Sequence, residues 1–271
     1  MMKNNLAILF VTIVLIFGVL RISHAATLYA VTWDENLISI DTTDASATLI
    51  GPVDSQMDAF GLADRNGELW TFDQKFDRMK RLDPMTGTTL ETVDVGFLPS
   101  FIGEGALTFD NSGNGYLANA RSFLGSNEGN LYSIDLDTAS SSTILGNFEF
   151  LGLDGMDFDS SGTLYGFTHG TAILYTIDPL TGASTMIGDT GFDSFPRLAG
   201  LTFMGDTLYG VMSGSLYTID PLTGAGALIG DIGFGDISGL TALNTIPIPP
   251  AILLFGSGLI GLISVARRKK S

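Results

Sequence analysis

Carboxylates are the main groups in this sequence that could do chemistry. The chain has 29 Asp and Glu residues but only two His and no Cys, which excludes thiolate metal sites and cysteine nucleophiles. His24 falls in a predicted signal peptide, so His169 is the only imidazole left after processing, and a multi-histidine zinc site cannot form in one chain. Carboxylates can instead hold a divalent cation, orient a sugar, or act as the acid and base of a glycosidase.

Five charged residues stand just before the first strand of successive sequence repeats. They are Asp58, Glu104, Asp154, Arg197 and Asp236. If the repeats close into a ring, these residues meet near one mouth of a central channel and form a candidate ligand site, with Asp58, Glu104 and Asp154 as candidate catalytic groups. Chance alignment is the simpler explanation, because acidic residues are abundant and mostly exposed. A deep channel with converging carboxylates would favour an enzyme, and a plugged channel would argue against one.

Two Asp-rich segments, residues 110–115 and 157–162, resemble the start of a calcium-binding loop. Oxygen donors alternate along them, and Gly is the sixth residue of each. The candidate metal ligands are Asp110, Asn114, Asp157 and Asp159. However, the twelfth position is Arg121 or Thr168 instead of a bidentate Glu, and no helices flank the loops. Hairpin turns are therefore the favoured interpretation, and calcium is the alternative. No other cofactor is predicted.

The elements that would position these groups belong to a repeat. A strand that ends in an aliphatic residue and Asp recurs five times, with the Asp residues 42, 52, 43 and 42 positions apart. The copies are residues 37–41, 79–83, 131–135, 174–178 and 216–220. Apolar and polar residues alternate in these copies, which is typical of half-buried strands, and the period is that of a propeller blade.

Each copy contains four short strands, and an Asp-Pro-Leu-Thr-Gly turn joins the third strand to the fourth in residues 178–182 and 220–224. The first copy lacks its first strand, while a spare first strand follows the fifth copy. We therefore predict an all-β, five-bladed β-propeller over residues 26–245, with blades of about 44 residues that close between the two ends. The blades are 27–54, 60–96, 105–146, 155–191 and 200–233, with a closing strand at 239–243. A β-solenoid or a sandwich is the alternative; neither a WD40 nor a kelch signature is present.

The two ends of the chain predict export and anchoring. Residues 1–25 have the charge pattern, apolar stretch and small residues of a signal peptide, cleaved between Ala25 and Ala26. Residues 246–266 carry no charge and are long enough to span a bilayer, and a basic cluster follows them. An uncleaved N-terminal anchor and a buried C-terminal core helix are the alternatives. The protein is expected to cross the inner membrane and to remain anchored, or to reach the cell surface after processing.

The C-terminal tail, residues 246–271, combines a short proline motif, a Gly-containing apolar helix and a basic end. Its defining residues are Pro247, Pro249, Pro250, Arg267, Arg268, Lys269 and Lys270. This tail resembles the sorting signal of the PEP-CTERM family, in a Val-Pro-Leu-Pro-like variant, because Ile248 stands where the motif that names the family has Glu. The resemblance implies a sorting protease of the exosortase type and an extracellular polysaccharide or biofilm context.

Charge narrows the class of partner. All 29 acidic residues but only seven of the 13 basic ones lie between the two end segments, which gives this region a net charge of −22. Such a charge argues against nucleic-acid binding. It favours solubility, divalent cations or cationic partners. Exposed aromatic side chains could stack on sugar rings, and Trp33, Trp70 and Phe123 are the candidates.

These features favour a non-enzymatic, exported surface protein that binds or organises extracellular polymer, with polysaccharide as the expected polymer. A secreted, carboxylate-dependent enzyme that acts on glycans in the propeller channel is the first alternative. A structural component of the cell surface is the second.

Overall fold

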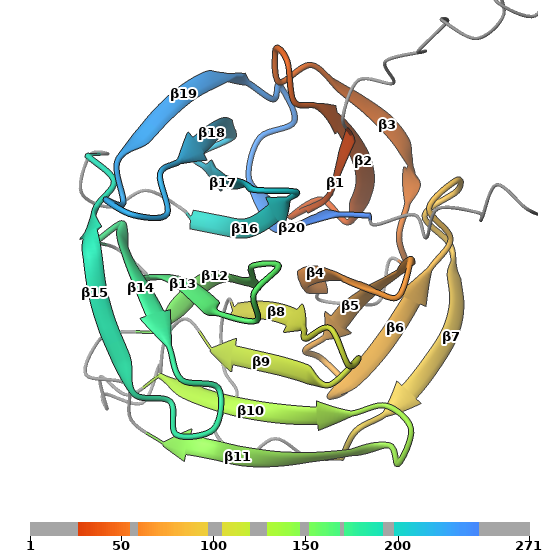
Figure 1. The fold of residues 1–271 in the computed structure, drawn as a ribbon. Coiled ribbons are helices and arrows are strands. Elements are labelled where there is room, and N and C mark those ends of the chain that lie inside the picture. The colour runs from red at the N-terminus through yellow and green to blue at the C-terminus, as the bar shows by residue number, and fades with distance from the viewer. Residues whose placement is uncertain are drawn as a thin grey trace, which may run out of the picture.

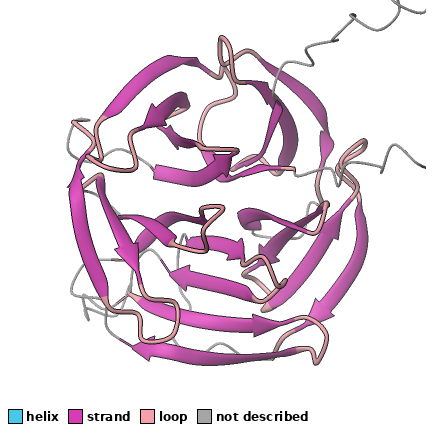
Figure 2. Ribbon diagram, in the orientation of Figure 1, coloured by secondary structure: helices cyan, strands magenta, loops and turns pink. Residues whose placement is uncertain are grey.

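The computed structural model describes residues 27–54, 59–96, 105–119, 129–146, 152–168, 171–191 and 198–243. These residues form five four-stranded antiparallel sheets arranged as the blades of a ring, and no helix occurs among them (Figures 1 and 2). The prediction of an all-β, five-bladed β-propeller is therefore confirmed. No helix in the described part of the chain is long and apolar enough to cross a membrane. The predicted signal peptide and tail lie outside the described residues.

Each blade runs from an innermost to an outermost strand. Blade 1 contains β20 (Ile237–Ala242), β1 (Thr27–Thr32), β2 (Asn36–Asp41) and β3 (Ala47–Pro52). Blade 2 contains β4 (Ala59–Arg65), β5 (Glu68–Asp73), β6 (Arg78–Leu82) and β7 (Thr89–Asp94). Blade 3 contains β8 (Gly105–Phe109), β9 (Gly115–Asn119), β10 (Asn130–Asp135) and β11 (Ser140–Gly146). Blade 4 contains β12 (Leu153–Phe158), β13 (Leu164–Thr168), β14 (Ile173–Ile177) and β15 (Ser184–Asp189). Blade 5 contains β16 (Leu198–Met204), β17 (Thr207–Met212), β18 (Ser215–Ile219) and β19 (Gly226–Asp231).

The ring closes as the sequence predicts. β20, the last described strand, pairs antiparallel with β1, the first, and places Leu28 opposite Ala242. Blade 1 is thus assembled from both ends of the chain, which removes the open edges of an unclosed array. Because Leu28 lies next to Ala242, the described chain begins and ends on the same face of the ring.

The turns that join third and fourth strands are held by their own Asp. In blade 5, Asp220 accepts hydrogen bonds from the backbone N–H of Leu222 (2.9 Å) and the hydroxyl of Thr223 (2.8 Å). Gly224 then adopts a φ of +81°, which Gly tolerates without strain, and the chain returns as β19. Blade 4 repeats this turn around Asp178.

The hydrophobic core is divided between neighbouring blades. Each of five clusters of buried side chains joins residues of two adjacent blades. One cluster, for example, packs Leu174 of blade 4 with Leu208 and Met212 of blade 5. Burial of apolar surface therefore holds blade to blade, while backbone hydrogen bonds hold each blade together.

The innermost strands approach one another closely because small residues stand where they touch. These residues are Gly61, Ala106, Gly155, Gly200 and Gly239. A Cβ on Gly155 would lie 2.6 Å from the backbone nitrogen of Leu201, and one on Gly200 would lie 2.4 Å from the Cβ of Leu240. The close approach leaves only about 10 Å³ of space at the waist of the channel, roughly enough for one water molecule.

Candidate functional site

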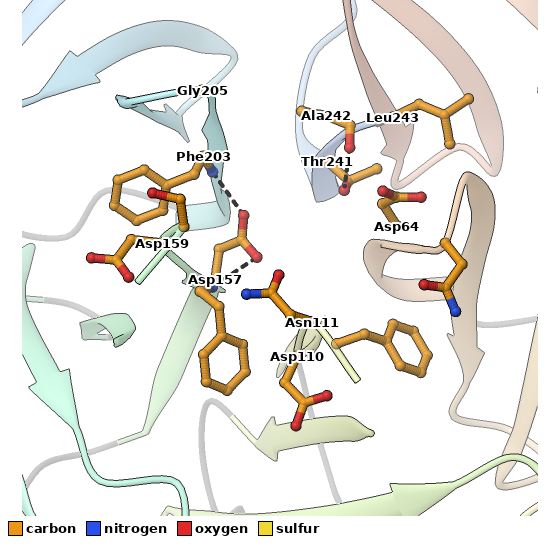
Figure 3. A pocket seen from close by; sticks show the side chains of 14 residues that line it. Asp64, Asp110, Asn111, Asp157, Asp159, Phe203, Gly205, Thr241, Ala242 and Leu243 are labelled. Carbon is orange, nitrogen blue, oxygen red and sulfur yellow. Dashed lines mark hydrogen bonds between the residues drawn. The ribbon is translucent and has the colours of Figure 1, made fainter. Parts of the chain in front are cut away.

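A pocket of about 660 Å³ opens at one mouth of the channel, where the innermost strands end. We call this side of the ring the end face and the opposite side, where those strands begin, the start face. Four carboxylates, two amides and three aromatic rings are among the groups that line the pocket (Figure 3). They are Asp64, Asp110, Asp157, Asp159, Asn66, Asn111, Phe109, Phe158 and Phe203. Since the channel is nearly closed at its waist, the pocket is a cup and not a tunnel.

Asp157 breaks the pattern of the innermost strands. Each innermost strand carries one of the five small residues at the channel waist. Two residues further along the strand stands Thr108, Thr202 or Thr241 in three of the other blades, and Ala63 in blade 2. In blade 4 this position is Asp157, on β12. An acidic side chain therefore takes the place of a hydroxyl at the bottom of the pocket.

The Asp157 carboxylate joins three blades. One oxygen accepts hydrogen bonds from Thr108 Oγ1 of blade 3 (2.7 Å) and from the backbone N–H of Phe158 (2.9 Å). The other accepts from Thr202 Oγ1 (3.0 Å) and from the backbone N–H of Phe203 (2.7 Å), both in blade 5. Figure 3 shows this carboxylate between Phe203 and Asn111, with Asp64 across the pocket.

Enclosure of this carboxylate changes its acidity. Burial raises the pKa of Asp157 to about 6, even though the four hydrogen bonds favour the charged form. Both protonation states fit the geometry, since a Thr hydroxyl can rotate to accept a hydrogen bond from the protonated acid. Burial thus moves the pKa of Asp157 toward neutral pH.

Asp110 and Asp159 close tight hairpins at the rim of the pocket. Asp110, between β8 and β9, accepts hydrogen bonds from the backbone of Ser112 and Asn114. Asp159, between β12 and β13, accepts them from Ser161 and Thr163. Burial opposes ionisation of Asp159, but these hydrogen bonds outweigh it and hold its pKa below the usual value.

The two calcium-like segments are hairpins in the structure, although Asp157 belongs to β12 itself and not to a turn. No group of three or more His, Asp or Glu side chains in the described ranges is placed to hold a metal ion. The candidate ligands Asp110, Asn114, Asp157 and Asp159 therefore do not converge on one cation.

Two of the three aromatic rings of the pocket are fixed by neighbours from the preceding blade. Phe158 packs against Tyr116 with 5.3 Å between ring centroids, and Phe203 against Tyr165 with 5.2 Å. Such contacts lock each ring in place. The pocket therefore presents preformed apolar faces beside its carboxylates.

Only two of the five predicted ligand residues are among the described residues, and neither lines the pocket. Asp58, Glu104 and Arg197 are outside the described residues. Asp154 is 2% exposed and lines the closed waist. Asp236 is partly exposed just before β20 on the start face, where its backbone oxygen accepts a hydrogen bond from Trp33. The structure thus does not bring Asp154 and Asp236 into the pocket.

The two described aromatic candidates for sugar stacking differ in their exposure to solvent. Trp33 is 44% exposed, as sugar stacking would require, whereas Trp70 is 2% exposed. The prediction for Trp70 is wrong because its ring packs between blades 2 and 3. Phe123 and His169 lie outside the described residues.

Sequence reasoning missed the ends of the innermost strands. Asp64, Asn66, Asn111 and the three Phe residues were not among the candidates. The signal was available in the repeated Gly-Leu-Thr-Phe of residues 200–203, which aligns with Gly155 to Phe158 and exposes Asp157 as the exception. Only closure of the ring shows that these positions share a pocket.

The fold and the pocket define this chain as a five-bladed β-propeller with an acidic, aromatic cup at one mouth. No protein-family model matches the sequence, and no curated protein does either. Among solved structures, a chain of a nidogen/laminin complex is similar, with a TM-score of 0.57 and 14% identity over 81% of this chain and 98% of that one. A gluconolactonase from Xanthomonas campestris has a TM-score of 0.51 and 14% identity over 80% and 79% of the two chains. At this identity the likeness shows the fold alone.

Proposed function

We propose that this chain is a non-enzymatic, exported surface protein that binds extracellular carbohydrate in the pocket of its end face. The supporting observation is the pocket itself, in which carboxylate and amide groups stand beside fixed Phe rings. Sugar hydroxyls need such hydrogen-bonding partners, and the apolar C–H faces of a sugar pack on aromatic rings. The near closure of the channel waist favours a ligand that enters the cup from one side, such as a chain end or a side branch of a polymer.

Export and anchoring remain part of the proposal and rest on the two sequence ends. The described chain begins and ends on the end face, so a signal peptide and a sorting tail of the exosortase type would both join the ring there. Processing of the tail would release the ring and free the end face for polymer.

The second candidate is a carboxylate-dependent enzyme that acts on glycans, and one observation favours it. Asp157 has a pKa of about 6, a value suited to a general acid or base near neutral pH. Against this role, each Asp157 oxygen already accepts two hydrogen bonds from the protein. A side chain held in this way is better suited to joining blades than to proton transfer, so we favour binding.

The test is a glycan-binding measurement on the full-length chain in mild detergent, with calcium and with a chelator. We expect saturable binding without release of reducing sugar. Asp64→Asn should weaken binding about tenfold, because it removes a charge from the pocket. The amide oxygen can still accept the hydrogen bond that Asp64 takes from the backbone N–H of Gly67, so the turn is retained.

Asp231→Asn is the matched control, since it removes one exposed charge from the outermost strand of blade 5, and its amide oxygen can still accept the hydrogen bond from the backbone N–H of Gly233. It should leave glycan binding unchanged. Release of reducing sugar that Asp64→Asn or Asp157→Asn abolishes would establish the enzyme instead. Equal binding by the wild type and Asp64→Asn would place the carbohydrate site elsewhere.

A further inference from the structure

The cations of the described residues are confined to one blade. All five belong to blade 2 and are Arg65, Lys75, Arg78, Lys80 and Arg81. Three of them have ion-pair partners at 3.1 Å or less. Arg65 pairs with Asp137 (2.9 Å), Arg81 with Glu91 (3.0 Å), and Lys80 with both Asp54 (3.0 Å) and Asp73 (3.1 Å).

Lys75 and Arg78 instead flank an exposed aromatic ring. The Lys75 Nζ and the Arg78 Cζ each lie 5.4 Å from the centroid of the Phe76 ring, which is 45% exposed. Arg78 has only a long contact of 3.8 Å with Asp94. The ring holds two cations near each other in an otherwise acidic protein.

This group lies on the start face. It forms the turn between β5 and β6, and Asp73 at the end of β5 pairs with Ala59, the first residue of β4. The turn is therefore on the side where the innermost strands begin, opposite the pocket.

A second aromatic platform lies on the same face, in the neighbouring blade. Trp33 follows Thr32, which pairs with Ile237, the first residue of β20. Its indole meets Phe60 edge to face, with 5.7 Å between centroids and 85° between planes. A hydrogen bond of 3.0 Å from its backbone N–H to Asp236 also anchors it. Trp33 is thus an exposed but fixed ring.

We propose that the start face of blades 1 and 2 is a second binding site, and that it takes a polysaccharide bearing carboxylates. Its elements are Trp33, Phe60, Lys75, Phe76 and Arg78, which we call the start-face strip. The indole stacks on the apolar face of a sugar, and the two cations pair with carboxylates of the polymer. The strip goes beyond the proposed function, because two sites on opposite faces let one molecule bridge two polymers.

Charge and orientation favour this partner over other polyanions. Double-stranded DNA carries a charge about every 1.7 Å, far more than two cations on a chain of net charge −16 can neutralise. A second copy of this chain is also disfavoured. As long as copies are anchored through their tails, they all present the start-face strip outward and not to one another's acidic pockets, because the described chain begins and ends on the end face.

The experiment measures binding of galacturonate oligomers to the full-length chain in mild detergent by calorimetry. The methyl-esterified oligomer, which has the same sugar rings without charge, is the matched ligand. We expect the acidic oligomer to bind more tightly and its affinity to fall with added salt. Lys75→Gln with Arg78→Gln should weaken it about tenfold, and Trp33→Ala about fivefold.

Arg81→Gln removes a cation from the same blade outside the strip and should leave the affinity unchanged. The pocket variant Asp64→Asn should also leave it unchanged, which separates this site from the carbohydrate pocket. Equal affinities for the acidic and esterified oligomers, or for wild type and the double variant, would overturn the proposal. Equal binding of DNA would reduce the strip to a general polyanion surface. Salt-sensitive self-association lost in the double variant would assign it to a second copy instead.

Discussion

The innermost and outermost strands of each blade occupy different environments. β20 is buried at every position, whereas β19 exposes Ala227, Leu228 and Asp231. An innermost strand touches the innermost strands on both sides, while an outermost strand has solvent along one edge. A change in an inner residue is therefore transmitted to neighbouring blades, and a change at the rim stays local.

The same contrast applies to the aspartates. Asp220 at the rim holds only its own turn. Asp157 accepts hydrogen bonds from blades 3 and 5. The rim aspartates are repeated because each turn needs one, whereas Asp157 stands once among threonines and shapes the pocket. The pocket is thus shaped at an inner position where one repeat departs from the others.

The largest effect should come from filling the gap between innermost strands. Gly200→Val should destabilise the protein by about 3 kcal/mol or more, because the added carbons collide with Leu240 and the backbone cannot move away. Urea unfolding of the full-length chain, followed by tryptophan fluorescence, measures this. Ala227→Val places the same valine side chain on the exposed rim of the same blade and should change little. Equal effects of the two variants would refute the contrast between inner and outer strands.

The next effect depends on pH through Asp157. Its pKa is about 6 in the folded protein, against 3.8 as the unperturbed value, so the folded state binds the extra proton between these values. The stability that this group contributes should therefore fall as pH rises from about 3 to about 7, by up to about 3 kcal/mol in all.

Asp157→Asn supplies the reference for this measurement. The variant lacks the titration, so the advantage of the wild type over it should be largest at the acid end of the range. Each oxygen of Asp157 accepts a hydrogen bond from one backbone N–H, of Phe158 or of Phe203. The NH₂ group of the introduced amide would therefore face one of these donors in either orientation, so the variant should be less stable than the wild type. A difference between the two proteins that is constant with pH would show that Asp157 does not titrate in this window.

A smaller effect is expected from the rim turns. Asp220→Ala removes the acceptor for Leu222 and Thr223 and should lower the urea midpoint less than Gly200→Val does. Asp220→Asn keeps one acceptor oxygen and should recover part of the loss. The hydrogen bond from Leu222, followed by that from Thr223, holds the pKa of Asp220 below its usual value. The contribution of Asp220 should therefore persist at neutral pH and disappear as its carboxylate is protonated in acid solution, whereas the contribution of Asp157 is lost as pH rises.

The smallest effect should come from an exposed apolar side chain. Leu228 on β19 is 63% exposed, so Leu228→Ser should change stability by less than about 0.5 kcal/mol. Leu201→Ser, at a buried position of β16, should be far more damaging. A large loss of stability from Leu228→Ser would indicate that another molecule of this protein covers the rim of the blade. Analytical ultracentrifugation would then detect this self-association.

Local patterns explain why so much of the fold was predictable. The alternating strands and the Asp-Pro-Leu-Thr-Gly turns are short-range features, and residues 239–243 match the missing first strand of the first repeat. The candidate site was less predictable. Its alignment before a predicted strand makes Asp154 a candidate ligand residue, yet it lines the closed waist. The sequence makes Asp157 a candidate calcium ligand, because a single repeat does not reveal that Thr108 and Thr202 of other blades approach it.

The sequence by itself therefore determined the strands, their turns, the number of repeats and the closing of the ring, since each depends on residues within one repeat or on matching one repeat to another. Only the tertiary structure decided which mouth holds the pocket, that Asp157 joins three blades, and that Trp33 is exposed while Trp70 is buried. These properties arise between blades, from side chains about 40 to 50 residues apart in the chain. Such side chains meet because five small residues let the innermost strands approach one another closely.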